Sequence, residues 1–74
     1  MVKKELDIAY FISFCIEQYK VHISANGNEV MDLFDKYGVT EYLSDNFEIL
    51  HTHSRQWLLE EIDGFIQQKK EEIG

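Results

Sequence analysis

The sequence is poor in cysteine, glycine and proline. Of its 74 residues, one is cysteine, four are glycine and none is proline. The lone Cys15 excludes a disulfide within the chain. Its neighbours Phe14 and Ile16 are apolar, and such surroundings raise the pKa of a thiol and favour a packed, unreactive side chain. The scattered glycines form no phosphate-binding loop. Because no linker or low-complexity tract interrupts the chain, we expect one domain over residues 1–74.

Basic residues are also scarce, with 7 lysines and arginines against 14 aspartates and glutamates and a formal net charge of −7. The stretch from Glu29 to Asp63 carries the whole imbalance, with nine acidic residues against only Lys36 and Arg55. Nucleic-acid binding depends on basic side chains that neutralise phosphates, so this charge argues against a nucleic-acid partner. A basic protein partner fits better, unless the acidic residues only solvate the outer faces of helices.

No apolar run in the sequence approaches the length of about 20 residues that a membrane span requires. The run from Ile8 to Ile16 is far shorter than this. The two lysines that precede it resemble the start of a signal peptide, but Glu5 and Asp7 interrupt that pattern and no small-residue cleavage site follows. We therefore expect a soluble cytoplasmic protein that has no membrane partner.

Apolar residues recur with helical spacing along the chain, and no segment shows the sustained alternation typical of a strand. We therefore predict an all-α fold, a compact bundle of about four helices with no extended sheet, apart from a short extended piece near Ile49. Asn26 followed by Glu29 is typical of a capping box, and Gly38 is placed for a left-handed cap. The expected helices run from about Lys4 to His22, from Asn26 to Gly38, from a Thr40 cap through Leu50, and from a Thr52 or Ser54 cap to Ile73.

The second and last helices each have one apolar face, which should point into the core. Phe34 lies within the stripe of the second helix, so we expect it to be buried. In the last helix Trp57 and Leu59 broaden the apolar face, whereas Glu61 and Asp63 are expected to point outward. The two inner stripes consist of Val30, Leu33, Phe34 and Tyr37, and of Leu58, Ile62, Phe65, Ile66 and Ile73.

The first helix is apolar on two sides. Ile8, Ile12, Cys15, Ile16 and Tyr19 form one stripe with Phe11 beside it, and Leu6, Tyr10 and Phe14 form the other. Few other residues remain to cover both stripes, so we expect the second one to face another polypeptide. The predicted partner-binding residues are its two aromatics and five acidic residues that would attract a basic surface: Tyr10, Phe14, Asp32, Asp35, Glu41, Asp45 and Glu48.

The sequence contains no catalytic constellation. It lacks a Gly-x-Ser-x-Gly elbow, and its adjacent glutamates would point about 100° apart on a helix, so they form no acid–base pair. We therefore expect no enzyme activity, no catalytic residue and no cofactor. The strongest chemical candidate is a metal site built on Glu48, His51 and His53, because a glutamate and a histidine three apart share a helix face. The alternative, which we favour, is a polar turn in which His51 bonds to backbone groups at a helix end.

Five segments of the chain carry recognisable motifs: Phe-Ile-Ser-Phe-Cys-Ile-Glu-Gln-Tyr-Lys at 11–20, Leu-Phe-Asp-Lys-Tyr-Gly-Val at 33–39, Tyr-Leu at 42–43, Leu-His-Thr at 50–52 and Glu-Ile-Asp at 61–63. Together these motifs resemble a known family of short bacterial proteins, classed only as a domain of unknown function, and the resemblance covers nearly the whole chain. Members of that family are often encoded beside a second small protein that resembles ADP-ribosyltransferase-type toxins. The resemblance therefore implies an antitoxin-like or accessory role and supplies no catalytic residue.

Three hypotheses for the function follow. The first is a non-catalytic module that binds another protein, as the neutralising half of a two-protein pair. The second is a structural homodimer closed by the stripe that contains Tyr10 and Phe14. The third is a metal-binding helical protein.

Overall fold

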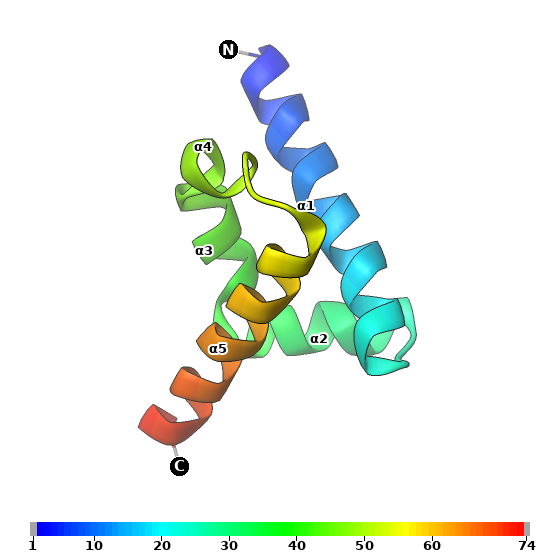
Figure 1. The fold of residues 1–74 in the computed structure, drawn as a ribbon, viewed down its shortest axis with the longest axis vertical. Helices are drawn as coiled ribbons and strands as arrows, with labels where there is room; N and C mark the ends of the chain where they lie inside the picture. Colours follow the sequence, from blue (N-terminus) through cyan, green and yellow to red (C-terminus); the bar gives the residue numbers. More distant parts are fainter. Residues whose placement is uncertain (1, 74) are drawn as a thin grey trace.

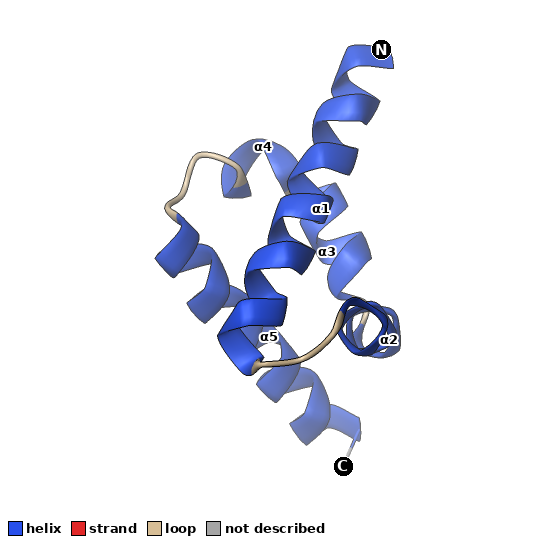
Figure 2. Ribbon diagram, turned by 90° about the vertical axis from the view of Figure 1, so that its right-hand side faces the viewer, coloured by secondary structure: helices blue, strands red, loops and turns tan. Residues whose placement is uncertain are grey.

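Five α-helices and no strand make up residues 2–73, the part of the chain that the computed structural model describes; side chains are described for residues 4–72. The predicted all-α class is therefore confirmed (Figures 1 and 2). The radius of gyration is 12.0 Å, as expected for a compact chain of this length. The helices are α1 (Val2–Ile23), α2 (Gly27–Tyr37), α3 (Val39–Asp45), α4 (Phe47–Leu50) and α5 (Arg55–Ile73).

The core lies where α1, α2, α3 and α5 meet. α1 contacts α2, α3 and α5, and α2, which runs across the view in Figure 1, is seen nearly end-on in Figure 2. Phe34 is fully buried, as predicted, and its ring centroid lies 5.6 Å from that of Tyr19. The buried side chains are Phe11, Cys15 and Tyr19 of α1, Val30 and Phe34 of α2, Val39 and Leu43 of α3, Leu50 of α4, and Leu58, Leu59, Ile62 and Ile66 of α5.

Local signals determine both ends of α2. The backbone N–H of Glu29 donates to Asn26 Oδ1 at 2.8 Å, and the backbone N–H of Asn26 donates to Glu29 Oε1 at 3.0 Å. This reciprocal pair is the predicted capping box. At the other end Gly38 has a φ of 70° and its N–H bonds to carbonyls of the last turn, which confirms the left-handed cap.

The chain between Gly38 and α5 differs from the prediction at three points. α3 begins directly at Val39, so Thr40 lies inside the helix and the predicted Thr40 cap is wrong. The expected single helix through Leu50 is interrupted at Asn46, whose side-chain amide donates to the carbonyl of Tyr42 at 2.9 Å. The predicted extended piece near Ile49 is also wrong, because Ile49 lies in α4.

Two polar side chains close the turn between α4 and α5. Thr52 Oγ1 donates to the carbonyl of Ile49 at 2.9 Å and so satisfies a free carbonyl at the end of α4, whose C-cap is His51. Ser54 Oγ accepts the backbone N–H of Trp57 at 3.2 Å, which makes Ser54 the residue that caps α5. Of the two predicted caps, Ser54 is therefore confirmed.

The two glycines Gly38 and Gly64 allow a matched test of these backbone assignments. Gly38→Ala should lower the free energy of unfolding by about 1–2 kcal/mol, because an alanine at positive φ is strained even though space is available. Gly64→Ala should raise it by about 0.5–1 kcal/mol, because Gly64 lies inside α5 and an added Cβ meets nothing within 4 Å. Urea unfolding followed by circular dichroism measures both changes. Equal effects of the two substitutions would contradict the assigned backbone conformations.

Candidate partner-binding groove

The outer face of α1 leaves a line of apolar side chains in contact with solvent. Leu6 is 50% exposed, Tyr10 is 69% exposed and Phe14 is 42% exposed. These three residues, called the α1 stripe below, lie one helical turn apart on the side of α1 away from Phe11, Cys15 and Tyr19, which are buried. The prediction that α1 has a second apolar face not covered by its own chain is therefore confirmed, whereas contact with another polypeptide stays a prediction.

An open groove of about 760 Å³ lies beside this stripe, between α1 and α4. The α1 side and the α4 side are far apart in sequence and meet because α1 contacts α3 and Phe11 of α1 packs against Phe47 of α4. Both aromatic residues of the predicted partner-binding set lie in this groove. The α1–α4 groove is lined by Lys4, Asp7, Tyr10, Phe11, Phe14, Phe47, Glu48 and His51.

Aromatic rings form a fixed wall of the α1–α4 groove. The Phe11 and Phe47 rings meet edge to face, with centroids 5.5 Å apart. The imidazole of His51 stacks on Phe47 with centroids 4.5 Å apart, and its Nδ1 donates to the Phe47 carbonyl at 2.8 Å. This hydrogen bond at the end of α4 confirms the predicted role of His51 in a polar turn. Because each ring is held by a neighbour, the wall exists before any partner arrives.

The charged rim of the groove contains an exposed ion pair. Lys4 Nζ lies 3.0 Å from Glu48 Oε1, and the two side chains are 60% and 72% exposed. The hydrogen bond and positive charge of Lys4 lower the pKa of Glu48 from its ordinary value. Asp7, one turn after Lys4 on α1, adds a second carboxylate to the rim. The rim thus presents two carboxylates and one ammonium group.

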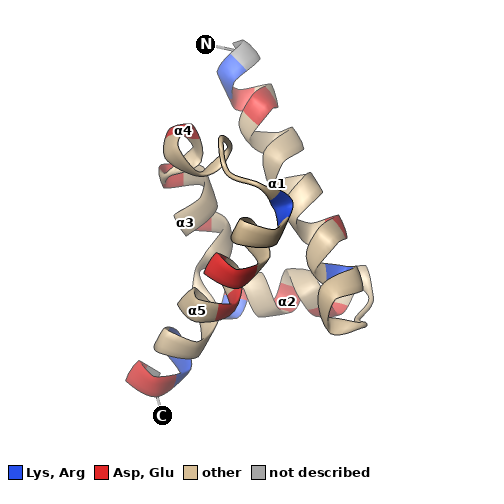
Figure 3. Cartoon of the chain, viewed as in Figure 1, with Lys and Arg blue, Asp and Glu red and all other residues tan. Residues whose placement is uncertain are grey.

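The structure brings only part of the predicted acidic set to this site. Glu48 lines the α1–α4 groove, whereas Asp32 and Asp35 lie exposed on α2, and Glu41 and Asp45 lie exposed on α3, outside the groove lining. Figure 3 shows the acidic residues spread over several helices. The predicted set therefore divides into the groove residues Tyr10, Phe14 and Glu48 and a more distant acidic surface.

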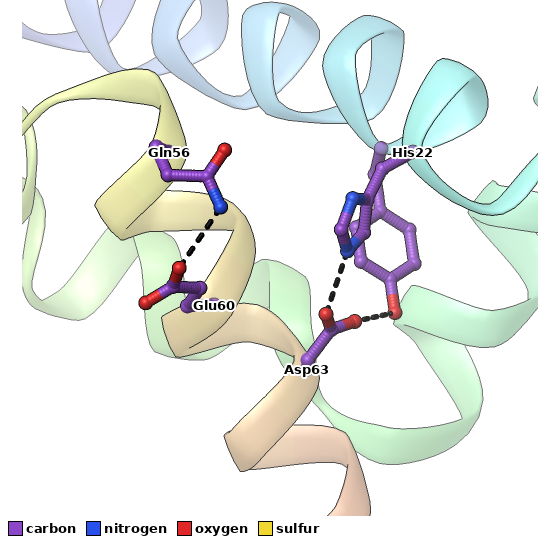
Figure 4. A network of polar contacts seen from close by, with 5 residues as sticks. His22, Gln56, Glu60 and Asp63 are labelled. Carbon is purple, nitrogen blue, oxygen red and sulfur yellow. Dashed lines mark hydrogen bonds and ion pairs between the residues drawn. The ribbon is translucent and has the colours of Figure 1, made fainter.

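A polar network near the C-terminal end of α1 joins this helix to α5. Asp63 accepts the hydroxyl of Tyr19 and the Nε2–H of His22, each at 2.6 Å (Figure 4). Burial and the hydrogen bond to Asp63 raise the pKa of Tyr19 above its ordinary value. Gln56 and Glu60 form a separate bond along α5, at 2.9 Å. The expectation that Asp63 points outward is therefore wrong, because it is half-buried and ties two helices together.

Glu61 departs from the prediction for the same reason. Tyr42 of α3 donates its hydroxyl to Glu61 at 2.5 Å, and this bond is the main cause that raises the pKa of Tyr42 to about 12. Leu59, predicted only to broaden the apolar face, is buried in the core, while Trp57 keeps 36% of its surface exposed. α5 therefore contacts its neighbouring helices through a wider part of its circumference than the predicted apolar stripe.

The three residues of the metal hypothesis are engaged separately. Glu48 pairs with Lys4, His51 bonds to a backbone carbonyl, and the ring of His53 stacks on Trp57 with centroids 3.7 Å apart. Over the described side chains, no group of three or more histidine, cysteine, aspartate or glutamate residues is arranged to hold a metal ion. Cys15 is buried, and burial raises the pKa of its thiol to about 12.

Five lining residues of the groove were not among the predicted partner-binding residues: Lys4, Asp7, Phe11, Phe47 and His51. The sequence signal for Phe11 and Phe47 was their apolar character, which indicated core positions and gave no reason to place them at a groove. The pairing of α1 with α4 is a tertiary contact that local spacing does not encode.

None of the helices within residues 2–73 combines the length and apolarity needed to cross a membrane.

Comparison with known proteins places the chain in a family. No curated protein and no solved structure matches it. Residues 10–69 match the family described as protein of unknown function (DUF3791), which confirms the expected likeness to an uncharacterised family. The matched region includes the aromatic wall of the α1–α4 groove, while Lys4 and Asp7 precede it. Because the match covers most of the sequence, this chain belongs to the DUF3791 family of proteins of unknown function.

Proposed function

We propose that this protein is a small non-catalytic interaction module that binds a basic protein partner through the α1 stripe and the α1–α4 groove. The observation that carries the proposal is the exposure of Tyr10 and Phe14 directly beside an open groove with an aromatic wall. Contiguous exposed apolar surface on a small protein is typical of an interaction site. Aromatic side chains also contribute much of the binding free energy at protein interfaces.

Charge favours a different protein over a second copy of this chain as the partner. The net charge is −7, so two copies would repel each other, whereas a basic surface would be attracted. Asp32, Asp35, Glu41 and Asp45 lie outside the groove and would act at longer range, by raising the rate of encounter. The homodimer remains the second candidate function, because the same exposed stripe could close a symmetric interface.

The biological role that we propose is that of an antitoxin-like partner in a bacterial two-protein module, acting in the cytoplasm. Support comes from the resemblance to short bacterial proteins encoded beside toxin-type proteins. A small acidic domain with an exposed aromatic face is suited to covering a basic surface on such a protein. In this role the chain needs no catalytic residue, metal ion or cofactor of its own.

A selection experiment with a salt series tests the proposed function. A random peptide library displayed on phage would be selected against the immobilised protein, and the selected peptides would be measured by surface plasmon resonance. We expect peptides with net positive charge and apolar residues, whose association rate falls by roughly tenfold between about 50 and about 500 mM salt because exposed charges become screened. Acidic or neutral peptides with a salt-independent association rate would contradict the basic-partner proposal.

The homodimer is distinguished by the mass of the protein in solution. Sedimentation equilibrium at micromolar concentration should give the monomer mass of 8.8 kDa. A dimer that dissociates when Tyr10 and Phe14 are replaced by serine would favour the second candidate. A stable dimer that is insensitive to these substitutions would place the dimer interface elsewhere and contradict a homodimer closed by the α1 stripe.

A further inference from the structure

The α1–α4 groove combines the two kinds of group that recognise an organic cation. Aromatic rings present a negative face to a cation. Four rings line the groove: those of Tyr10 and Phe14, which are exposed, and those of Phe11 and Phe47, which pack against each other. Carboxylates accept hydrogen bonds from a charged donor, and the rim contains those of Asp7 and Glu48. Rings and carboxylates thus line one open volume of about 760 Å³.

We propose that the α1–α4 groove binds an arginine side chain of the partner protein. This inference rests on the proposed function and names the chemistry that the groove selects. A guanidinium group is planar, stacks on aromatic faces and donates two parallel hydrogen bonds to a carboxylate. An ammonium group has neither the planar fork nor the weak hydration that stacking requires. The groove is therefore expected to bind arginine more tightly than a neutral side chain of the same shape.

Lys4 already demonstrates that a cation fits at the rim. Its Nζ lies 3.0 Å from Glu48 Oε1, so the chain's own ammonium group already forms an ion pair with one of the two carboxylates of the rim. Both partners of this pair are largely exposed, and exposed ion pairs contribute little and exchange readily. An incoming guanidinium can therefore displace Lys4 from Glu48. Lys4 is then an internal competitor that weakens binding of the partner's arginine.

Rings elsewhere in the chain are already paired with its own lysines. Lys36 and Lys70 lie 5.4 Å and 6.0 Å from the ring centroid of Tyr37, and Lys69 lies 5.4 Å from that of Phe65. Within residues 4–72, no lysine or arginine is placed over the four groove rings in this way. The exposed rings of Tyr10 and Phe14, together with Asp7, are therefore available to a cation from outside the molecule.

A titration monitored by nuclear magnetic resonance tests this inference. The labelled protein would be titrated with Nα-acetyl-arginine amide and with Nα-acetyl-citrulline amide, which has nearly the same shape but no charge. We expect the arginine probe to shift amide signals at residues 4–14 and 47–51 and to bind about fivefold more tightly than citrulline, the effect of one exposed cation–π contact and one exposed ion pair. Equal shifts from both probes would overturn the inference.

Two matched variants test the competitor role of Lys4. Lys4→Met should tighten binding of the arginine probe by about threefold, because it releases the Glu48 carboxylate. Lys69→Met makes the same change in net charge on α5, where Lys69 pairs with Glu72, and should change the affinity by less than about 1.5-fold. Equal effects of the two variants would overturn the competitor role and show that only net charge matters.

A last comparison separates this inference from the proposed function. A peptide selected from the library would be resynthesised with each arginine replaced by citrulline. Loss of groove binding supports recognition of arginine. Retained binding in the groove overturns the arginine inference and leaves the interaction module intact. If the original peptide also fails to shift the groove signals, both proposals are overturned.

Discussion

Replacing Phe34 by alanine is expected to lower the free energy of unfolding by about 3–5 kcal/mol, which is as much as a domain of this size is expected to have. Phe34 is fully buried, and its ring packs against Tyr19 of α1 at the centre of the molecule. Removing the ring forfeits its burial and leaves a cavity that short helices can fill only in part. We therefore expect the variant to be largely unfolded near room temperature.

Circular dichroism during urea or thermal unfolding measures this loss. Met31→Ala is a suitable control, because Met31 lies on the same helix and is 52% exposed. It should change the free energy of unfolding by less than about 1 kcal/mol. If Phe34→Ala keeps a cooperative transition near the original midpoint, the assignment of Phe34 to the core is wrong.

The second large effect is expected on binding. Replacing both Tyr10 and Phe14 by serine should weaken the complex with a selected basic peptide by more than about 100-fold, because two aromatic anchors of about 2 kcal/mol each would be lost. The fold should survive, since Tyr10 is 69% exposed and Phe14 is 42% exposed, while Phe11, Cys15 and Tyr19 still hold α1 in the core. Surface plasmon resonance gives the affinity, and circular dichroism gives the helix content.

Val21→Ser provides the matched control for this double variant. Val21 lies on the same helix and is 75% exposed, but it does not line the α1–α4 groove. Its replacement should leave the affinity within about twofold of the original value. If the double variant unfolds instead, Tyr10 and Phe14 contribute to the core, and the interface is better sought around Trp57, which is 36% exposed.

The helices that local signals define could be predicted from the sequence. The limits of α2 follow from the capping box at Asn26 and from the positive φ at Gly38, both of which act within a few residues. The burial of Phe34 follows from helical spacing alone. Ser54 was one of two possible caps, and the choice between it and Thr52 depended on how α4 ends.

Features that depend on tertiary contacts could not be predicted. Asp63 and Glu61 are polar residues on an otherwise solvated face, and they turn inward because the tyrosines Tyr19 and Tyr42 reach them from other helices. The break at Asn46 is a local feature, where the side-chain amide donates to the carbonyl of Tyr42 four residues earlier, and no proline or glycine marks it in the sequence. The two tyrosine–carboxylate pairs join residues that are far apart in the sequence, and no local pattern marks either residue as part of a pair.

The candidate site was predictable only in part for the same reason. Two apolar sides on α1 indicated that Tyr10 and Phe14 would be exposed, because periodicity within one helix determines their direction. The contribution of Phe47 and His51 depends on where α4 lies against α1, which the sequence pattern does not encode. Net charge indicated an acidic surface, but it could not place Asp32 or Asp35 relative to the groove.

Site-specific photo-crosslinking in the native cells is the most direct test that the α1 stripe contacts a partner. The photoreactive amino acid p-benzoylphenylalanine would replace Tyr10 in one variant and Val21, on the same helix, in the other. We predict an adduct with a single basic protein at position 10 and none at position 21. Equal adducts at both positions, an adduct between two copies of this chain, or no adduct at position 10 would contradict the proposed interaction.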